Sequence, residues 1–270
     1  MSRKKQKAKV WIGTSGWVYK HWRNGVFYPE HHPVGEQLQF YAGLFPTVEV
    51  NYSFYRLPER FVFEQWRKET PKGFLFAVKA SRYLTHMKKL KDPAEPLERL
   101  MDRASGLDEK LGPILFQFPR SWPIHIDRLE PFTRLLKSYR RQRFAFEFRH
   151  ESWLTKEVYN LLESADAALC IPVAPGMPLD ARLTARWSYI RFHRGSRGVG
   201  FGEKELRLWA RRVRSFLKEG AEVYVYFNDD TKGYAIRDAK RLREMLDERP
   251  NEPFRRTSRA PRLESSCHRA

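Results

Sequence analysis

The sequence predicts an α/β protein, a single (β/α)8 barrel of the TIM type. Apolar runs of strand length alternate with helical patterns about eight times along the chain, and this alternation is typical of parallel β/α units. The 270 residues, of which 41% are hydrophobic, also suit such a barrel, which needs roughly 250 residues. A doubly wound open sheet is the alternative, but no G-x-G-x-x-G motif follows the first apolar run.

The strands are expected in short apolar runs that end in polar residues or glycine. In the second run, Val48 and Val50 alternate with Glu49 and Asn51, which is the two-residue period of a strand. The expected strands lie in 9–17, 47–55, 73–81, 113–119, 143–150, 167–175, 187–195 and 221–230.

Helical spacing follows seven of these eight runs, and the segment after the sixth has no clear helical pattern. In 96–112, for example, Leu97, Leu100 and Ala104 fall on one face of a helix, and Gly112 follows its end. The expected helices lie in 37–45, 60–70, 96–112, 129–140, 155–166, 203–220 and 234–246.

The chain is strongly basic, with a net charge of +19 at pH 7. The first nine residues contribute +5 and the segment from Pro250 onward contributes +3, which leaves +11 for the body. Such a body favours phosphate-bearing partners such as nucleic acid, although a basic bias of the host's proteins would give the same charge. Because both ends are poor in apolar residues, we expect a disordered basic extension (1–8), a barrel domain (9–249) and a disordered basic tail (250–270).

Cysteine content and the N-terminus bear on location. Cys170 and Cys267 are the only cysteines, which excludes a disulfide framework and a cysteine-based zinc cluster. The start "MSRKKQKAKVWIG" lacks the apolar run of a signal peptide, and no stretch approaches the ~20 apolar residues of a membrane span. We therefore expect a cytoplasmic protein without membrane contact.

Polar side chains occupy alternating positions late in six of the expected strands. The segment "FAFEFRH" (144–150) shows the pattern best, since a run this apolar ends in a carboxylate, a guanidinium and an imidazole. In a β/α barrel the active site lies at the C-terminal ends of the strands, so these side chains should converge there. A self-satisfied lattice of ion pairs that closes the barrel is the alternative. The residues are Glu49, Asn51, Lys79, Ser81, Gln117, Glu147, Arg149, Arg191, His193, Tyr226, Asn228 and Asp229.

We expect Glu49, Glu147 and His193 to be catalytic, with a carboxylate as general base and the imidazole as acid. Cations of the cluster would hold an anion. The expected substrate-binding residues are Asn51, Lys79, Gln117, Arg149, Arg191, Arg194, Tyr226 and Asn228. A divalent metal on Glu49, Glu147, His193 and Asp229 is chemically possible, but no motif indicates one, so the cofactor stays unknown.

Two further features suggest ligand contacts. The glycine-rich segment "HRGSRGVGFG" (193–202) follows the seventh strand, where barrel enzymes often bind phosphate, although a mobile loop would look the same. Aromatic residues near the strand ends would stack on a base or a sugar, or simply pack, and His86 after the third strand would touch substrate or cap a helix. The aromatic candidates are Trp22, Tyr28, Tyr55 and Trp153.

Stretches from residue 12 to about 246 resemble, in order, the domain of unknown function 72 (YecE-like) family. They are "IGTSGW", "HW", "FYP", "TVEVNYSFYRLP", "FAVKASRYLTHMKKL", "LGPILFQFP", "FAFEFRHESW", "YIRFHRG", and "VYVYFNDD" followed by "GYA". The resemblance implies a β/α barrel and no settled activity.

This chain departs from the family pattern in three places. Many relatives carry an acidic residue after the sixth strand, where this chain reads "CIPVAP". Relatives tend to have glycine directly after the histidine of the seventh strand, where Arg194 intervenes, and more often read Asn-Asn where this chain has Asn228-Asp229. If the sixth-strand acid is catalytic in the family, the resemblance implies an impaired activity here.

These features together predict an enzyme that acts on a phosphorylated substrate, by hydrolysis of a phosphate ester or of a lesion in nucleic acid. Two alternatives remain open. One is a non-catalytic protein that holds a nucleotide or a sugar phosphate in the same mouth, and the other is a sugar or sugar-phosphate isomerase or lyase. The oligomeric state is left open.

Overall fold

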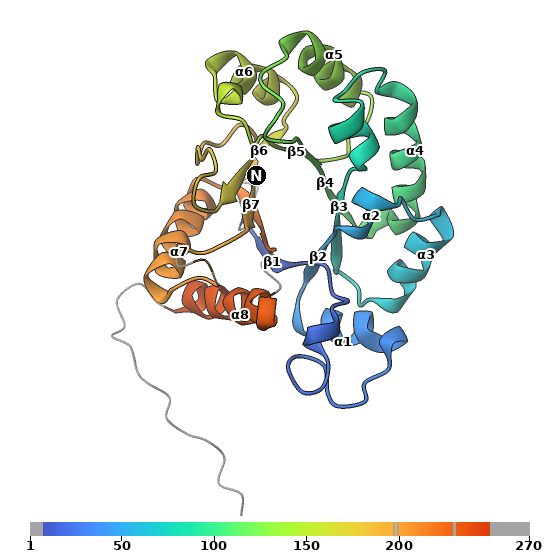
Figure 1. Cartoon of the computed structure of the whole chain (residues 1–270), viewed down its shortest axis with the longest axis vertical. Coiled ribbons are helices and arrows are strands. Elements are labelled where there is room, and N and C mark those ends of the chain that lie inside the picture. The colour runs from blue at the N-terminus through green and yellow to red at the C-terminus, as the bar shows by residue number, and fades with distance from the viewer. Residues whose placement is uncertain (1–7, 197, 199, 229–230, 249–270) are drawn as a thin grey trace, which may run out of the picture.

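The computed structural model of the chain describes residues 8–196, 198, 200–228 and 231–248. Eight parallel strands form a closed barrel in which the last strand pairs with the first, and helices surround the barrel (Figure 1). This confirms the (β/α)8 barrel. The expected extension up to residue 7, the whole expected tail (250–270) and Asp229 lie outside the described residues.

Strands and helices alternate along the chain. The strands are β1 (Val10–Ser15), β2 (Thr47–Val50), β3 (Leu75–Lys79), β4 (Leu111–Gln117), β5 (Phe144–Glu147), β6 (Ala168–Val173), β7 (Trp187–Phe192) and β8 (Glu222–Phe227). The helices are α1 (Gln37–Leu44), α2 (Tyr52–Tyr55), α3 (Arg60–Glu69), α4 (Ala94–Ala104), α5 (Ile126–Leu136), α6 (Lys156–Ser164), α7 (Glu203–Lys218) and α8 (Tyr234–Asp247). None of the helices within the described ranges has the length and apolar character needed to cross a membrane.

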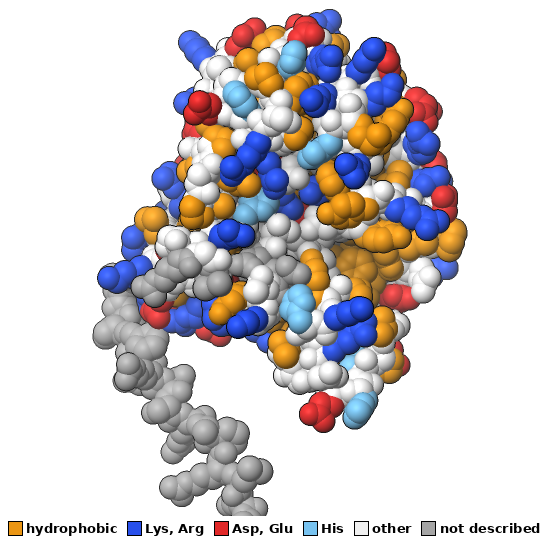
Figure 2. Space-filling view, in the orientation of Figure 1, with side chains coloured by type: hydrophobic (Ala, Val, Ile, Leu, Met, Phe, Trp, Pro, Cys, Tyr) orange, Lys and Arg blue, Asp and Glu red, His pale blue; other side chains and the backbone are white. Residues whose placement is uncertain are grey.

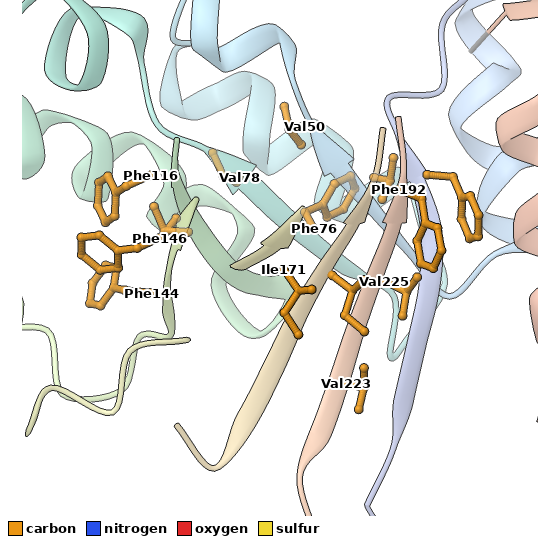
Figure 3. Packing of buried hydrophobic residues seen from close by; sticks show 14 of the residues in the cluster. Val50, Phe76, Val78, Phe116, Phe144, Phe146, Ile171, Phe192, Val223 and Val225 are labelled. Atoms are coloured by element: carbon orange, nitrogen blue, oxygen red, sulfur yellow. The ribbon is translucent and has the colours of Figure 1, made fainter. Parts of the chain in front are cut away.

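The strands bury both of their faces. Outward side chains such as Phe76, Phe146 and Val225 join one hydrophobic cluster with residues of the surrounding helices (Figure 3). Inward side chains such as Ala77 and Tyr189 form a second, smaller cluster inside the barrel. Because successive residues of a strand point to opposite faces, the inward set also includes the charged residues near the strand ends.

The N-terminal end of the barrel is closed by a polar and aromatic plug. Arg143, just before β5, donates hydrogen bonds to the Glu222 carboxylate and to the Tyr224 hydroxyl across the barrel. The same guanidinium lies 5.7 Å from the ring centroid of Trp187. These contacts fill the N-terminal end of the barrel with side chains.

The prediction of a strand over 47–55 was wrong in its second half. β2 ends at Val50, and Tyr52–Tyr55 form a short helix. The Ser53 hydroxyl donates to the Val50 carbonyl at 2.9 Å and to the Lys79 carbonyl at 2.7 Å. These side-chain hydrogen bonds stabilise a turn in a segment whose alternating apolar residues favoured a strand.

The prediction of one helix over 96–112 was also wrong in part. α4 ends at Ala104, a 3₁₀ segment covers Ser105–Lys110, and β4 begins at Leu111. Gly106 packs so closely on α3 that an added Cβ would lie 2.6 Å from the Arg60 carbonyl oxygen. The left-handed backbone of Asp108 (φ 48°) then ends the helical path.

The end of β5 also differs from the sequence prediction. β5 ends at Glu147, so Arg149 and His150 follow the strand instead of belonging to it. The described segment between β6 and β7 contains no helix, in line with its unclear pattern.

Gly13 offers a test of how tightly β1 and β2 pack. A Cβ on Gly13 would lie 2.0 Å from the Thr47 carbonyl oxygen, whereas a Cβ on Gly43 in α1 would meet nothing within 4 Å. We expect Gly13→Ala to lower the melting temperature by many degrees because two backbones must separate. We expect Gly43→Ala to stabilise the protein by about 0.4–1 kcal/mol. Thermal unfolding followed by circular dichroism measures both, and a Gly13→Ala variant as stable as the parent would contradict the packing.

Candidate functional site

Arg191 lies at the centre of a charged cluster near the C-terminal ends of the strands. Its guanidinium donates from Nε and Nη2 to the two carboxylate oxygens of Glu49, at 2.9 and 2.7 Å. Its Nη1 donates to Glu147 Oε2 at 2.7 Å. All three side chains are at most 1% exposed. The cluster thus joins β2, β5 and β7, which are not neighbours in the barrel.

Glu49 has hydrogen-bond donors on both oxygens. Besides Arg191, the Ser15 hydroxyl donates to Oε1 at 2.7 Å and the Tyr189 hydroxyl donates to Oε2 at 2.7 Å. Burial acts to raise the pKa of this carboxyl, but Arg191 and the two hydroxyls outweigh burial and lower the pKa. Glu49 is therefore held as an ionised anchor for Arg191.

Glu147 is surrounded in the same way. Gln117 Nε2 donates to Oε1 at 2.7 Å and Arg149 Nε donates to the same oxygen at 2.8 Å. His193 Nε2 lies 3.2 Å from Oε1. Burial again acts to raise the pKa of the carboxyl, but Arg191, His193 and Arg149 hold it well below its usual value. A carboxylate that is so well bonded is a weak base.

His193 is held between Glu147 and an amide pair. Asn228 Nδ2 lies 3.2 Å from His193 Nδ1, and Asn51 Nδ2 donates to Asn228 Oδ1 at 3.2 Å. Since an amide nitrogen only donates, Nδ1 is the acceptor and the ring proton is assigned to Nε2, toward Glu147. Burial lowers the pKa of His193, which favours the neutral ring.

Lys79 lies at the end of β3 and is 9% exposed. Among the described residues, its Nζ has no hydrogen-bond or ion-pair partner, and it lies 4.1 Å from the ring centroid of Phe54 in α2. Burial, together with the charge of Arg191, lowers the pKa of Lys79 from 10.5 to about 7.

The outer part of the cluster has a positive potential. His86 Nδ1 lies 3.0 Å from the Thr85 hydroxyl, and its ring packs edge-on against Phe54. Burial and the charges of Lys79, Arg149 and Arg82 lower the pKa of His86 to about 4. On the face that carries α2, Lys, Arg and His side chains lie across the middle, and Asp and Glu lie mostly toward the edge (Figure 2).

Two predicted substrate-binding residues lie apart from the cluster. Tyr226 is fully buried, and its hydroxyl lies 2.8 Å from Thr47 Oγ1 within the barrel. Arg194 is exposed and lines a separate cavity of about 530 Å³ beside Trp209. The structure brings together Glu49, Asn51, Lys79, Gln117, Glu147, Arg149, Arg191, His193 and Asn228.

The glycine-rich segment 193–202 does not present its described amides to a ligand. The Ser196 and Gly202 amides both donate to the Glu205 carboxylate at 2.9 Å, and the Phe201 amide donates to Asp238 at 2.7 Å. Carboxylates of the protein therefore occupy the positions that a phosphate would take, and the expected phosphate loop is not formed by these amides. Arg197 lies outside the described residues.

Of the aromatic candidates, three belong to the core. Trp22, Tyr28 and Trp153 are fully buried, and Trp153 stacks on Phe148 at 4.5 Å between ring centroids. Only Tyr55 of this set is exposed, at 75%.

Three residues of the candidate site were not predicted from the sequence. Ser15 and Tyr189 bind Glu49, and both could have been found from alternation, since Tyr189 lies two residues before Arg191 on the same face of β7. Phe54 was missed because its segment was interpreted as strand.

Metal ligands are not grouped in the part of the chain that the structure describes. No three His, Cys, Asp or Glu side chains there are arranged to hold an ion. Arg191 lies between the two carboxylates that the sequence suggested as ligands, and Asp229 is outside the described ranges.

A cavity of about 790 Å³ lies at the other end of the barrel. Arg140, Arg143, Arg186 and Glu222 are among its lining residues. Arg143 pairs there with Glu222, and Arg186 pairs with Asp166 at 3.1 Å. Because active sites of such barrels lie at the C-terminal end, the Arg191 cluster is the candidate functional site.

Comparisons with known proteins agree with the fold. The sequence profile of a family described as "Protein of unknown function DUF72" matches residues 11–264. The UPF0759 protein YunF of Bacillus subtilis (strain 168) is 27% identical over 275 residues, covering 88% of this chain and 95% of that protein.

Two crystal structures of DUF72 family proteins are also similar. TM1631 from Thermotoga maritima MSB8 has a TM-score of 0.77 and 32% identity, covering 89% of this chain and all of that one. EF0366 from Enterococcus faecalis V583 has a TM-score of 0.73 and 19% identity, covering 90% of this chain and 99% of that one, and it supports the fold alone.

Removing Arg191 is expected to destabilise the protein severely. Arg191→Ala leaves two carboxylates buried without their shared cation, and breaking such a pair costs about 3–5 kcal/mol. Arg194→Ala, three residues away and exposed, should change the free energy of unfolding by no more than about 0.5 kcal/mol. Urea denaturation compares the two variants, and equally small effects would show that the cluster contributes little.

Lys79 should give the stability a distinct pH dependence. Its pKa is about 7 in the folded protein and 10.5 ordinarily, so the unfolded chain binds more protons between these pH values. Between these pH values the free energy of unfolding of the parent should therefore rise with pH relative to that of Lys79→Met. Below about pH 7 the two free energies should change with pH in parallel. Urea denaturation at several pH values measures this difference. Parallel curves throughout would mean that Lys79 titrates normally.

Proposed function

The chain belongs to the DUF72 family of proteins of unknown function, and we propose that it is an enzyme that acts on a small phosphorylated substrate at the C-terminal mouth of its barrel. The observation that carries the proposal is a pair of incompletely neutralised cations. Lys79 Nζ has no polar partner among the described residues, and Arg149 bonds to Glu147 only through Nε. An anion would complete both.

Phosphate fits these groups by charge and by geometry. The side chain of Arg149 is 25% exposed, so the outer edge of its guanidinium is available for a paired contact with two oxygens. Lys79 would supply a point charge to a third oxygen. Burial lowers the pKa of His86 most, and the charges of Lys79, Arg149 and Arg82 lower it further; a bound dianion would compensate for those charges.

Arg191 was expected to hold the anion, and its contacts argue for another role. Each of its three nitrogens already donates to a carboxylate. We assign Arg191 and Glu49 to positioning, since together they fix Glu147, which in turn orients Arg149 and His193.

Proton transfer in this proposal falls to His193. The carboxylates expected as general bases are held in their ionised forms by cations, whereas the neutral ring of His193 exchanges a proton more readily near neutral pH. The amide of Asn228 orients the ring by donating to Nδ1, so a substrate group would displace this amide to exchange a proton with Nδ1. Small sugar phosphates are suitable substrates for such a site, because their phosphate binds the cations while a hydroxyl or carbonyl group faces the imidazole.

Phosphate binding is tested by thermal stabilisation. Inorganic phosphate or a sugar phosphate should stabilise the protein by about 2.7 kcal/mol at 100 times Kd. Lys79→Met and Arg149→Ala should each weaken this response, whereas Arg194→Ala should not. Arg194 is a suitable control because it is exposed and outside the cluster.

Two further measurements separate the alternatives. The first is the salt dependence of the stabilisation in each variant. If all variants keep the stabilisation and it falls steeply as the salt concentration rises, phosphate binds to a diffuse basic surface and the proposal is contradicted. Multiple turnover on a panel of sugar phosphates distinguishes an enzyme from a non-catalytic binding protein. Binding without turnover on any of them would leave only the binding function.

A further inference from the structure

Lys79 has an environment that a purely structural lysine does not need. Its side chain is only 9% exposed and its ammonium group has no acceptor among the described residues, and an unpaired charge with so little contact with water is unfavourable. An apolar side chain of similar length would fill the same space without that penalty. The chain nevertheless places an amine there.

The wall beside the amine is built from α2. Ser53 bonds through its hydroxyl to the backbone carbonyls of Val50 and Lys79, which ties α2 to the ends of β2 and β3. This attachment places the Phe54 ring over Nζ, at 4.1 Å from the ring centroid. The ring excludes water from one side of the amine, although its face also attracts the charged form.

Two guanidinium groups act on the same amine. After burial, the charge of Arg191 is the next cause of the lowered pKa, and Arg149 acts in the same direction. Glu49 and Glu147 oppose them, but the pKa still falls to about 7. A substantial fraction of Lys79 is therefore uncharged at neutral pH, and an uncharged amine is a nucleophile. Burial beside another cation is a recognised way to activate a lysine.

We propose that Lys79 is a catalytic nucleophile that forms an imine with an aldehyde or ketone group of the phosphorylated substrate. The inference rests on the proposed function for the phosphate, which Arg149 would hold beside the amine. It goes further in naming the substrate class, a phosphorylated carbonyl compound, and in placing the reaction at carbon instead of phosphorus.

The step balances without a further reactant. Nζ adds to the carbonyl carbon, the carbonyl oxygen takes up protons and leaves as water, and one proton from solvent remains on the resulting iminium nitrogen. The iminium group then accepts the electron pair of a C–H or C–C bond at the neighbouring carbon to give an enamine. The proton of the C–H bond passes to a neutral base or to water, whereas a C–C bond breaks as the departing fragment's hydroxyl loses its proton and that fragment leaves as an aldehyde or ketone. Protonation of the enamine and hydrolysis by water release the product and the free amine. The reaction class is accordingly that of a lyase or an isomerase.

The imine is tested by reductive trapping. The full chain is incubated with glycolaldehyde phosphate, a small phosphorylated aldehyde, and sodium cyanoborohydride, which reduces an iminium to a stable secondary amine. Peptide mass spectrometry locates the adduct. We expect Lys79 to be modified before the other lysines. The same extent of modification should need about tenfold less glycolaldehyde phosphate than glycolaldehyde, because one charge-assisted contact to the phosphate strengthens binding by about that factor.

Matched variants separate the nucleophile from the anion site. Lys79→Met and Lys79→Arg should abolish the adduct, whereas Lys72→Met, which removes an exposed lysine, should leave it unchanged. The rate of trapping at Lys79 should reach half its maximum near pH 7, well below that of surface lysines. Thermal unfolding of Lys79→Met confirms that it folds, since the substitution removes a buried cation.

The two ideas fail in different ways. Adducts spread over surface lysines, with Lys79 unmodified by either aldehyde, would overturn the imine while phosphate stabilisation could persist. Equal trapping of both aldehydes at Lys79 would support the imine and overturn the phosphate site. If Lys79 prefers the phosphorylated aldehyde in the parent and loses that preference in Arg149→Ala, the result would support both the imine and the phosphate site.

Discussion

The structure of the barrel mouth depends on one buried guanidinium between two carboxylates. Removing three charges from water is unfavourable unless geometry and further hydrogen bonds compensate for it. Here Arg191 donates to both carboxylates, and Ser15, Tyr189 and Gln117 satisfy their remaining oxygens. Because the three ions come from non-neighbouring strands, this arrangement fixes the positions of those strand ends relative to one another. It also makes the cluster intolerant of the loss of any one member.

The pairing within this cluster determines which groups remain for a ligand. With Glu49 and Glu147 bonded to Arg191, neither carboxylate neutralises Lys79 directly, and the outer part of the mouth keeps a positive potential. A bound anion would lower that potential. The same positive potential favours the uncharged form of the Lys79 amine. The proposed anion binding and the proposed nucleophilic chemistry would thus both follow from the same electrostatic imbalance. They can also be coupled, since a bound phosphate favours the protonated form of Lys79 and a carbonyl group needs the free amine.

The two ends of the barrel use similar residues in different ways. At the N-terminal end, Arg143 pairs with Glu222 and Tyr224 and is packed among aromatic rings, so its contacts close the barrel. At the C-terminal end the strands finish in buried residues, the residues that follow them, such as Asn51, Arg149 and Asn228, keep partial exposure, and α2 folds back over β3. The difference follows from chain connectivity. In such barrels the loops that lead from each strand to the next helix surround the C-terminal end, and active sites are built from these loops.

The sequence alone determined the barrel and the set of inward polar residues. Alternating strands and helices imply parallel β/α units, and the two-residue period of a strand places Glu49, Glu147 and Arg191 on inner faces. Those predictions depend on local periodicity, which a single sequence records. Periodicity was misleading where a tertiary hydrogen bond intervened, as at Ser53, whose partner Lys79 lies 26 residues away.

Only the tertiary structure decided which charges pair and which do not. Arg191 and Glu49 are separated by 142 residues, and periodicity gives the face of a residue but not its partner. The sequence therefore suggested Arg191 as an anion ligand and Glu49 as a base, whereas the fold joins them to each other. The state of Lys79 depends on distances to Arg191, Arg149 and Phe54 and on the exclusion of water. Electrostatic energies depend on separation and solvent exposure, and both exist only once the strands have closed into a barrel.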